Sequence, residues 1–110
     1  MAGSDLFVGT LDLLILKALS PGALHGYAIG RWIRDSTGEH LHIQEGVLYP
    51  ALHRLERRGL LAEEWGVTDT NREAKFYHLT AEGRRELRRQ TAQWRSHVTA
   101  VSAALGISLA

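Results

Sequence analysis

Hydrogen-bonding side chains recur at helical spacing near the middle of the chain. Tyr49, His53 and Arg54 would share the outward face of one helix, and Arg57 and Arg58 follow on that face. Phenol, imidazole and guanidinium groups donate hydrogen bonds to base edges and phosphates. We therefore expect the first three residues to contact nucleic acid and the two later arginines to be surface charges or phosphate partners. Charge alone favours the alternative, a solvated helix face, but a position after a helix-turn-helix pattern reverses that preference for Tyr49, His53 and Arg54.

A predicted hairpin supplies a second set of polar side chains. Residues 60–65 and 74–79 are typical of two short strands joined by a polar connection with turn chemistry. Arg72 near the tip and Lys75 slightly inward are placed to reach a phosphate or an adjacent minor groove, whereas Glu73 opposes such a contact. An exposed polar loop without a ligand explains these residues equally well.

The elements that position these side chains follow from the apolar spacing. Apolar residues recur every three or four positions in three segments before the hairpin and in one segment after it. The helices cover residues 11–19 with Thr10 as the N-cap, 25–37, 47–58, and 81 to about 105, where Gly106 follows as a terminator. The order predicts a mainly α fold with a small β-hairpin: a winged helix-turn-helix over residues 1–80 and a C-terminal helix over residues 81–110.

The last predicted helix carries the most regular apolar stripe in the chain. Its spacings of four and three are typical of a coiled-coil seam, and so small a domain has little surface left to cover so long a helix. We therefore expect it to pair with a second copy of the chain, with packing on the domain's own core as the alternative. The stripe consists of Leu87, Thr91, Trp94, Val98, Val101 and Leu105.

Composition and charge exclude several functional classes. The 110 residues have room for one compact core, and the formal net charge of +1 divides into −2 over residues 1–46 and +3 over residues 47–95. The absence of cysteine excludes disulfides, thiolate zinc sites and a cysteine nucleophile. The longest apolar stretch, 13–16, is far shorter than the ~20 residues that span a bilayer, and the N-terminus lacks a basic signal region. We expect a cytoplasmic protein without a membrane span.

Other side chains do not form a catalytic or metal-binding pattern. The serines stand in no nucleophile motif, so we expect neither an enzyme nor a cofactor. His40 and His42 would point to one side of an extended segment, but solvated loop histidines are far commoner than metal ligands, and we expect no metal site. Trp32 and Trp65 are expected to close the core rather than to stack on bases.

Four segments of the chain resemble the PadR-type bacterial transcriptional regulators. The specific part is the combination of Leu48-Tyr-Pro-Ala-Leu with Tyr77-His-Leu-Thr, since either fragment alone is a weak signal. The segments are Gly9-Thr-Leu-Asp-Leu-Leu-Ile-Leu, His25-Gly-Tyr-Ala-Ile, Gly46-Val-Leu-Tyr-Pro-Ala-Leu-His-Arg-Leu-Glu-Arg-Arg-Gly-Leu-Leu and Ala74-Lys-Phe-Tyr-His-Leu-Thr-Ala-Glu-Gly. The single helix after them resembles the short subfamily.

The resemblance implies a homodimer that binds operator DNA, usually as a repressor that a small molecule or another cue releases. It places Pro50, which would otherwise be awkward inside a helix, in the recognition helix. Val47 stands where many members have a small hydroxyl residue, and its methyl groups suit a thymine methyl instead. The DNA-binding set expected on these grounds is Gln44, Val47, Tyr49, Pro50, His53, Arg54, Tyr27, Arg72 and Lys75.

A binding site for a small-molecule effector is expected at the dimer seam. If the last helices cross at a two-fold axis, Trp94 faces its own copy, and two indoles can hold a planar aromatic molecule between them. Simple dimer packing is the alternative. The expected effector-binding residues are Trp94, Val98, Phe7 and Leu11. Two other functions remain open: a winged-helix protein-interaction module without operator binding, and a small-molecule carrier.

Overall fold

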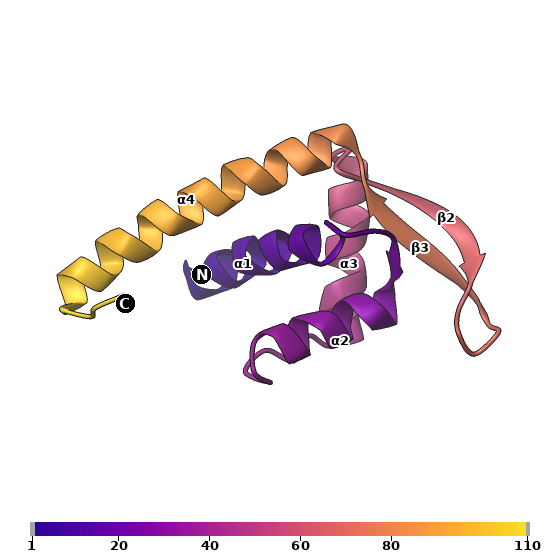
Figure 1. The fold of residues 1–110 in the computed structure, drawn as a ribbon, viewed down its shortest axis with the longest axis horizontal. Helices are drawn as coiled ribbons and strands as arrows, with labels where there is room; N and C mark the ends of the chain where they lie inside the picture. Colours follow the sequence, from indigo (N-terminus) through magenta and orange to yellow (C-terminus); the bar gives the residue numbers. More distant parts are fainter. Residues whose placement is uncertain (1, 110) are drawn as a thin grey trace.

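The computed structural model describes residues 2–109, with side chains from residue 9 onward, as four helices and a three-stranded antiparallel sheet (Figure 1). Their order confirms the mainly α, winged helix-turn-helix fold with a C-terminal helix. The elements are α1 (Ala2–Ala18), β1 (Leu24–His25), α2 (Gly26–Ser36), α3 (Glu45–Arg57), β2 (Leu61–Val67), β3 (Glu73–Leu79) and α4 (Ala81–Leu105).

Helix α1 begins earlier than its sequence pattern predicted. The prediction that Thr10 caps this helix is wrong, because α1 starts at Ala2 and Thr10 lies in its interior. A threonine inside a helix costs less than ~1 kcal/mol, so its preference for capping does not distinguish the first turn from a later one. The side chain of Phe7, which was expected near an effector, lies outside the described residues.

Helix α2 begins immediately after a short strand. His25 is its N-cap, and the His25 Nδ1 accepts a hydrogen bond from the Ala28 amide at 3.3 Å. Leu24 and His25 form β1 and pair with Tyr77 and Phe76 of β3. This strand was not predicted, because two residues are too few to show an alternating pattern.

Helix α3 continues through an internal proline. Pro50 has no N–H to donate and crowds the carbonyl four residues earlier, which belongs to Gly46. No neighbouring group lies within 4 Å of the position that a Gly46 Cβ would take, so this turn has space around it. The buried side chains of α3 are Leu48, Ala51, Leu52 and Leu55, which leaves the opposite face of the helix exposed.

Among the described residues, one hydrophobic cluster joins α1, α2 and α3 to the base of the sheet. Tyr77 of β3 is fully buried in it, and Trp32 packs against it from α2, as predicted. The prediction for Trp65 is wrong, because this side chain is 68% exposed. Trp65 lies on the part of β2 that extends beyond the cluster, where no helix covers the strand.

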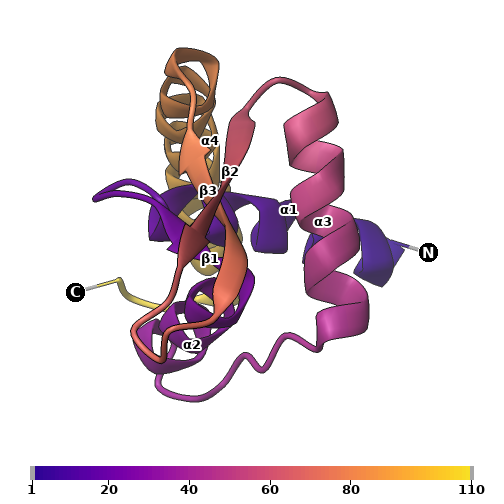
Figure 2. The same cartoon turned by 90° about the vertical axis from the view of Figure 1, so that its right-hand side faces the viewer.

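The wing consists of β2, β3 and the loop between them, which extends away from the helices (Figure 1). The strands pair from Leu61–Leu79 to Val67–Glu73, so they are slightly longer than predicted. The sheet order is β1-β3-β2, which places β2 at an edge. Figure 2 shows α3 standing beside this sheet.

Helix α4 has the predicted bounds. Thr80 caps it, with its Oγ1 accepting from the Gly83 amide at 3.0 Å, and Gly106 ends it in a left-handed conformation with φ 72°. The helix runs back past α1, away from the wing (Figure 1). Within the described residues, no helix combines the length and the apolar character that crossing a membrane requires.

Candidate nucleic-acid interface

A cleft of about 810 Å³ lies between the start of α2, the exposed face of α3 and the wing. Its walls come from segments that are far apart in the sequence and that the sheet and the helix-turn-helix bring together. Five of the predicted DNA-binding residues line it: Tyr27, Tyr49, His53, Arg72 and Lys75. The cleft is therefore the place where the predicted contacts converge.

The ring of Tyr49 is seated on a glycine at the start of α2. A Cβ added at Gly26 would lie 2.6 Å from the Tyr49 Oη and 2.7 Å from two of its ring carbons. Real Cβ atoms do not approach other atoms so closely, so Gly26 provides the space that the tyrosine occupies. The glycine thus determines how Tyr49 is presented to the cleft.

The variant Gly26→Ala is expected to move the Tyr49 ring and thereby to weaken the DNA binding that the residues of the cleft suggest. The lost contact corresponds to about 1–3 kcal/mol of binding free energy. Helix stability should not fall, because alanine is a better helix former than glycine. The measurement is a binding titration together with thermal melting.

The matched control for this variant is Gly30→Ala in the same helix. A Cβ at Gly30 would lie 3.7 Å from the Leu48 Cδ2, which is an ordinary contact. The affinity of this variant for DNA should therefore stay at the wild-type value. Equal affinities for the two variants would contradict the role assigned to Gly26.

A smaller hollow of about 470 Å³ lies between α2 and the start of α3. It is lined by Gln44, Tyr27 and Tyr49 from the predicted set, and also by Arg31 and Arg34, which were not predicted. The Arg31 guanidinium carbon lies 5.8 Å from the centre of the Tyr27 ring, within the range of a cation–π contact. The two arginines are three residues apart on α2, a spacing that could have identified this basic face.

Val47 and Pro50 are exposed on α3 but do not line the cleft. They occupy the first half of the helix, which is the part that a recognition helix usually presents to base edges. Their predicted role therefore does not depend on the cleft, and it stays a prediction.

Arg54 of α3 does not line the cleft. Its Nη2 donates to the Oδ1 of Asp12 on α1 at 2.5 Å, and Asp12 is buried. The prediction that Arg54 shares the outward face of α3 with Tyr49 and His53 is therefore wrong. A buried carboxylate without a partner costs several kcal/mol, which explains why the guanidinium turns toward α1. Arg54 connects two helices and is left out of the DNA contacts proposed below.

Lys75 lines the cleft but already has partners on the wing. Its Nζ lies 3.2 Å from the Oε1 of Glu63 and 5.8 Å from the centre of the Trp65 ring. Arg72 at the tip has an exposed side chain, and its backbone is fixed by hydrogen bonds with Thr68. On the wing, the side chain of Arg72 is therefore more available to a ligand than that of Lys75.

A pair of carboxyl groups lies behind the cleft, between α3 and β2. Burial and a hydrogen bond with Glu63 raise the pKa of Glu56, and the negative charge of Glu63 adds to the effect, while Lys75 and His53 oppose it. Burial also raises the pKa of Tyr77, with Glu63 and Glu56 as further causes. The negative charge of these acids opposes the positive potential of Lys75 and His53 in the cleft.

Most of the predicted dimerisation stripe on α4 is exposed. Trp94 and Val101 are each 43% exposed and Leu105 is 66% exposed, while Val98 is half-buried. Leu87 is partly buried and packs against the chain's own core, so its place in a dimer seam stays a prediction. Thr91 is exposed, and its hydroxyl donates to the Leu87 carbonyl at 2.7 Å.

A groove of about 840 Å³ lies between α1 and α4. Trp94 lines it, together with Leu13 of α1 and His97 of α4. The prediction that Leu11 lines an effector site is wrong, because Leu11 is only 1% exposed and belongs to the core. Helix α1 directs the Leu11 side chain into the core. The residues of α1 that line the groove lie one or two positions before or after Leu11.

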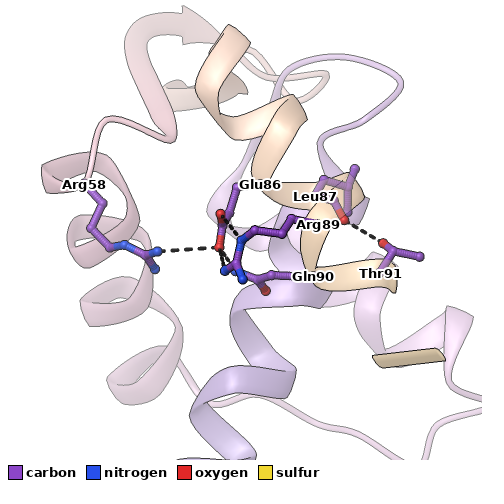
Figure 3. A network of polar contacts seen from close by, with 6 residues as sticks. All are labelled: Arg58, Glu86, Leu87, Arg89, Gln90 and Thr91. Atoms are coloured by element: carbon purple, nitrogen blue, oxygen red, sulfur yellow. Dashed lines mark hydrogen bonds and ion pairs between the residues drawn. The ribbon is translucent and has the colours of Figure 1, made fainter. Parts of the chain in front are cut away.

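The floor of the groove holds a polar network around Glu86 (Figure 3). Arg89 donates to both carboxylate oxygens, from Nε at 2.9 Å and from Nη2 at 2.5 Å, and the Gln90 Nε2 donates at 2.7 Å. The Nη2 of Arg58 lies 3.6 Å from the same carboxylate. The hydrogen bonds from Arg89 and then Gln90, together with the charges of Arg89 and Arg58, lower the pKa of Glu86 to about 2, against the effect of burial.

The network predicts an acid-sensitive contribution to stability. The pKa of Glu86 is lower in the folded chain than its ordinary value of 4.5, so the contribution is present above pH ~4.5 and is lost as the pH falls toward 2. Glu86→Gln is expected to lower the free energy of unfolding by up to about 3 kcal/mol at pH 7. The difference from wild type should vanish near pH 2, as measured by denaturant unfolding over a pH series.

The control for this series is Glu64→Gln. Glu64 is exposed and forms no ion pair within the described part of the chain. Its substitution should leave the pH dependence of stability unchanged. A Glu86→Gln chain with the wild-type pH dependence would contradict the account of the network.

Known proteins resemble this chain in sequence and in fold. Residues 15–89 match the family described as "Transcriptional regulator PadR-like family". A transcriptional regulator from Clostridium thermocellum is 30% identical, with a TM-score of 0.80 over 90% of this chain and 96% of that chain. A PadR family transcriptional regulator from Eggerthella lenta is 36% identical, with a TM-score of 0.77 over 94% and 88%.

The similarity extends to a mycobacterial relative. A transcriptional regulator of Mycobacterium tuberculosis is 41% identical over 59 residues, which are 53% of this chain and 54% of the relative. The matched segment thus spans about half the length of that relative. The family and the structural neighbours are transcriptional regulators and not enzymes.

Proposed function

Because the chain belongs to the PadR-like family of transcriptional regulators, we propose that it is a homodimeric repressor that binds a two-fold symmetric operator. In this proposal α3 enters the major groove, the wing reaches the adjacent backbone, and a planar aromatic effector releases the DNA. The three parts of the proposal rest on different observations and have separate tests.

The observation that carries the DNA-binding role is the cleft between α3 and the wing. Tyr49 and His53 from the helix and Arg72 from the wing tip line the same hollow, beside Tyr27 of α2. Side-chain donors on a recognition helix read base edges, and cations beside it fix the register on phosphates. Val47, Pro50 and Gln44, at the N-terminal half of α3, complete the proposed contact surface.

The dimer is supported by the apolar stripe that α4 leaves uncovered. Trp94, Val98, Val101 and Leu105 lie at spacings of four, three and four, and the chain's own core does not bury them. A stripe of this period is typical of a helix that pairs with another helix. If two copies pair through α4, their two α3 helices can reach two successive half-sites of the DNA, whose centres lie about 34–36 Å apart.

The test of the repressor is footprinting of the purified protein on the DNA upstream of its own gene. A protected two-fold site is expected, with an affinity that resists unrelated DNA and falls steeply as the salt concentration rises. Weak binding that unrelated DNA competes away would favour the protein-interaction module. Reporter expression from the protected promoter, with and without the protein, tests repression.

The effector role is supported by Trp94 in the groove between α1 and α4, with the half-buried Val98 on the same stripe. A planar aromatic ligand is expected to quench the Trp94 fluorescence and to lower operator affinity. Trp94→Ala should change dimerisation or this response. Ligand binding without any effect on DNA affinity would favour the small-molecule carrier.

A further inference from the structure

The first attachment of α4 to the DNA-binding domain is a backbone corner. The Thr80 amide donates to the Leu60 carbonyl at 3.1 Å, and the Thr80 Oγ1 donates to the Gly59 carbonyl at 2.7 Å. Gly83 lies directly against Leu60, since a Cβ at Gly83 would be 2.1 Å from the Leu60 carbonyl oxygen. This corner joins the first turn of α4 to the segment that follows α3.

The second attachment lies one helical turn further along α4. Glu86 has a side chain that is only 13% exposed, and Arg89 and Gln90 of the same helix hold its carboxylate in place (Figure 3). Arg58, the C-cap residue of α3, reaches this carboxylate at 3.6 Å. Within the described part of the chain, Arg58 is the Glu86 partner that comes from the end of α3, whereas Arg89 and Gln90 belong to α4.

The contacts of its first turns determine the angle at which α4 leaves the DNA-binding domain. The corner, the packing of Leu87 on the core and the hydrogen bond from the Arg84 Nη1 to the Ser20 carbonyl at 3.4 Å hold the first turns of α4. The Arg58–Glu86 ion pair also ties this end of α4 to the end of α3 and opposes rotation between the two helices. Helix α4 has 25 residues and is about 37 Å long at a rise of 1.5 Å per residue. A rotation of about 10° at the first turns of α4 would therefore move the far end by about 6 Å, which exceeds the ~3.4 Å that one base pair adds.

We propose that the Arg58–Glu86 ion pair is a positioning contact that contributes to the half-site spacing of the operator by fixing the angle between α3 and α4. The inference rests on the proposed homodimer, in which the far half of α4 joins the two copies. The angle between α3 and α4 in each copy then determines how far apart the two recognition helices lie. Glu86 and Arg58 act through α3 and need not touch DNA for this effect.

The experiment compares the footprinted operator with two derivatives, one with a base pair inserted and one with a base pair removed at its centre. Full-length wild type, Arg58→Met and Glu86→Gln are titrated on all three duplexes. Wild type is expected to bind the native spacing at least ~10-fold more tightly, because one base pair changes both the distance and the rotation between half-sites. In both variants the ratio of the affinity for the native spacing to that for the altered spacings should fall by about 3- to 10-fold, since the ion pair is lost in each of the two copies.

Two further variants separate positioning from charge and folding. Arg57→Met removes the same charge one residue earlier, and Arg57 forms no ion pair in the described part of the chain, so its spacing ratio should match wild type. Arg58→Lys keeps a cation within reach of Glu86 and should retain the ratio. Melting and sedimentation of each variant establish that a folded dimer is being compared, and Arg58→Lys against Arg58→Met remains informative if Glu86→Gln does not fold.

The failure of this inference differs from the failure of the proposed function. A wild-type chain that sediments as a monomer or protects no two-fold site would overturn the homodimeric repressor, and the spacing role with it. A dimer that prefers the native spacing, and keeps that preference in both Arg58→Met and Glu86→Gln, would overturn the spacing role alone.

Discussion

The double substitution Val101→Glu and Leu105→Glu is expected to convert the proposed dimer into a monomer and to weaken binding to the proposed operator by about 10²–10⁴-fold. The two residues are exposed on the far half of α4, where like charges from two copies would meet at the seam. Each recognition helix would then bind its half-site alone, without the effective concentration that the partner supplies. Sedimentation velocity measures the first effect and a binding titration the second.

The matched control adds the same charges to the opposite face of α4. Thr99 and Ala103 are also exposed and lie four residues apart, about half a turn from the stripe. A chain with Thr99→Glu and Ala103→Glu should remain a dimer, and any loss of affinity that it shows measures long-range repulsion from the DNA. If the stripe variant also stayed dimeric, another surface would have to hold the copies together.

Gly83→Ala is expected to destabilise the fold by about 3 kcal/mol or more, and thus to lower the melting temperature by more than ~10 °C. The added methyl group would lie 2.1 Å from the Leu60 carbonyl oxygen and 3.1 Å from the Leu79 Cδ2. The carbonyl is backbone and already accepts from the Thr80 amide, so it cannot turn away without loss of that bond. Circular dichroism melting measures the effect.

The control for this substitution is Gly9→Ala in α1. Nothing lies within 4 Å of the position that a Gly9 Cβ would take, and alanine is the better helix former. Its melting temperature should equal or exceed that of wild type. Equal melting temperatures for the two glycine variants would show that the corner between α4 and Leu60 is looser than these distances imply.

Local signals predicted the elements whose ends depend on nearby residues. Thr80 and Gly106 mark the ends of α4, because capping by a side chain and a left-handed terminal residue involve only adjacent turns. The periodic apolar residues of α2 and α3 likewise predicted helices within two residues of their actual bounds. Thr10 shows the limit of the same reasoning, since a capping residue can also lie inside a helix.

Tertiary pairing explains what the sequence pattern missed. Strand β1 exists because β3 supplies its hydrogen bonds, and its two residues carry no periodic signal of their own. Arg54 has the right helical position for an outward face, but its side chain forms an ion pair with the buried Asp12, which lies in a distant segment of the sequence. Of the candidate site, the convergence of Tyr49, His53 and Arg72 was therefore predictable, whereas the direction of Arg54 required the packing of α1.

The placement of the three tryptophans gives the chain a built-in set of optical reporters. Trp32 is packed against the core, Trp65 lies on the open wing and Trp94 lines the groove beside the α4 stripe. Chains that retain one indole at a time, with phenylalanine at the other two positions, would have emission that follows folding, wing contact or subunit association separately. The order in which these events occur during operator binding can then be resolved in a stopped-flow experiment without any attached dye.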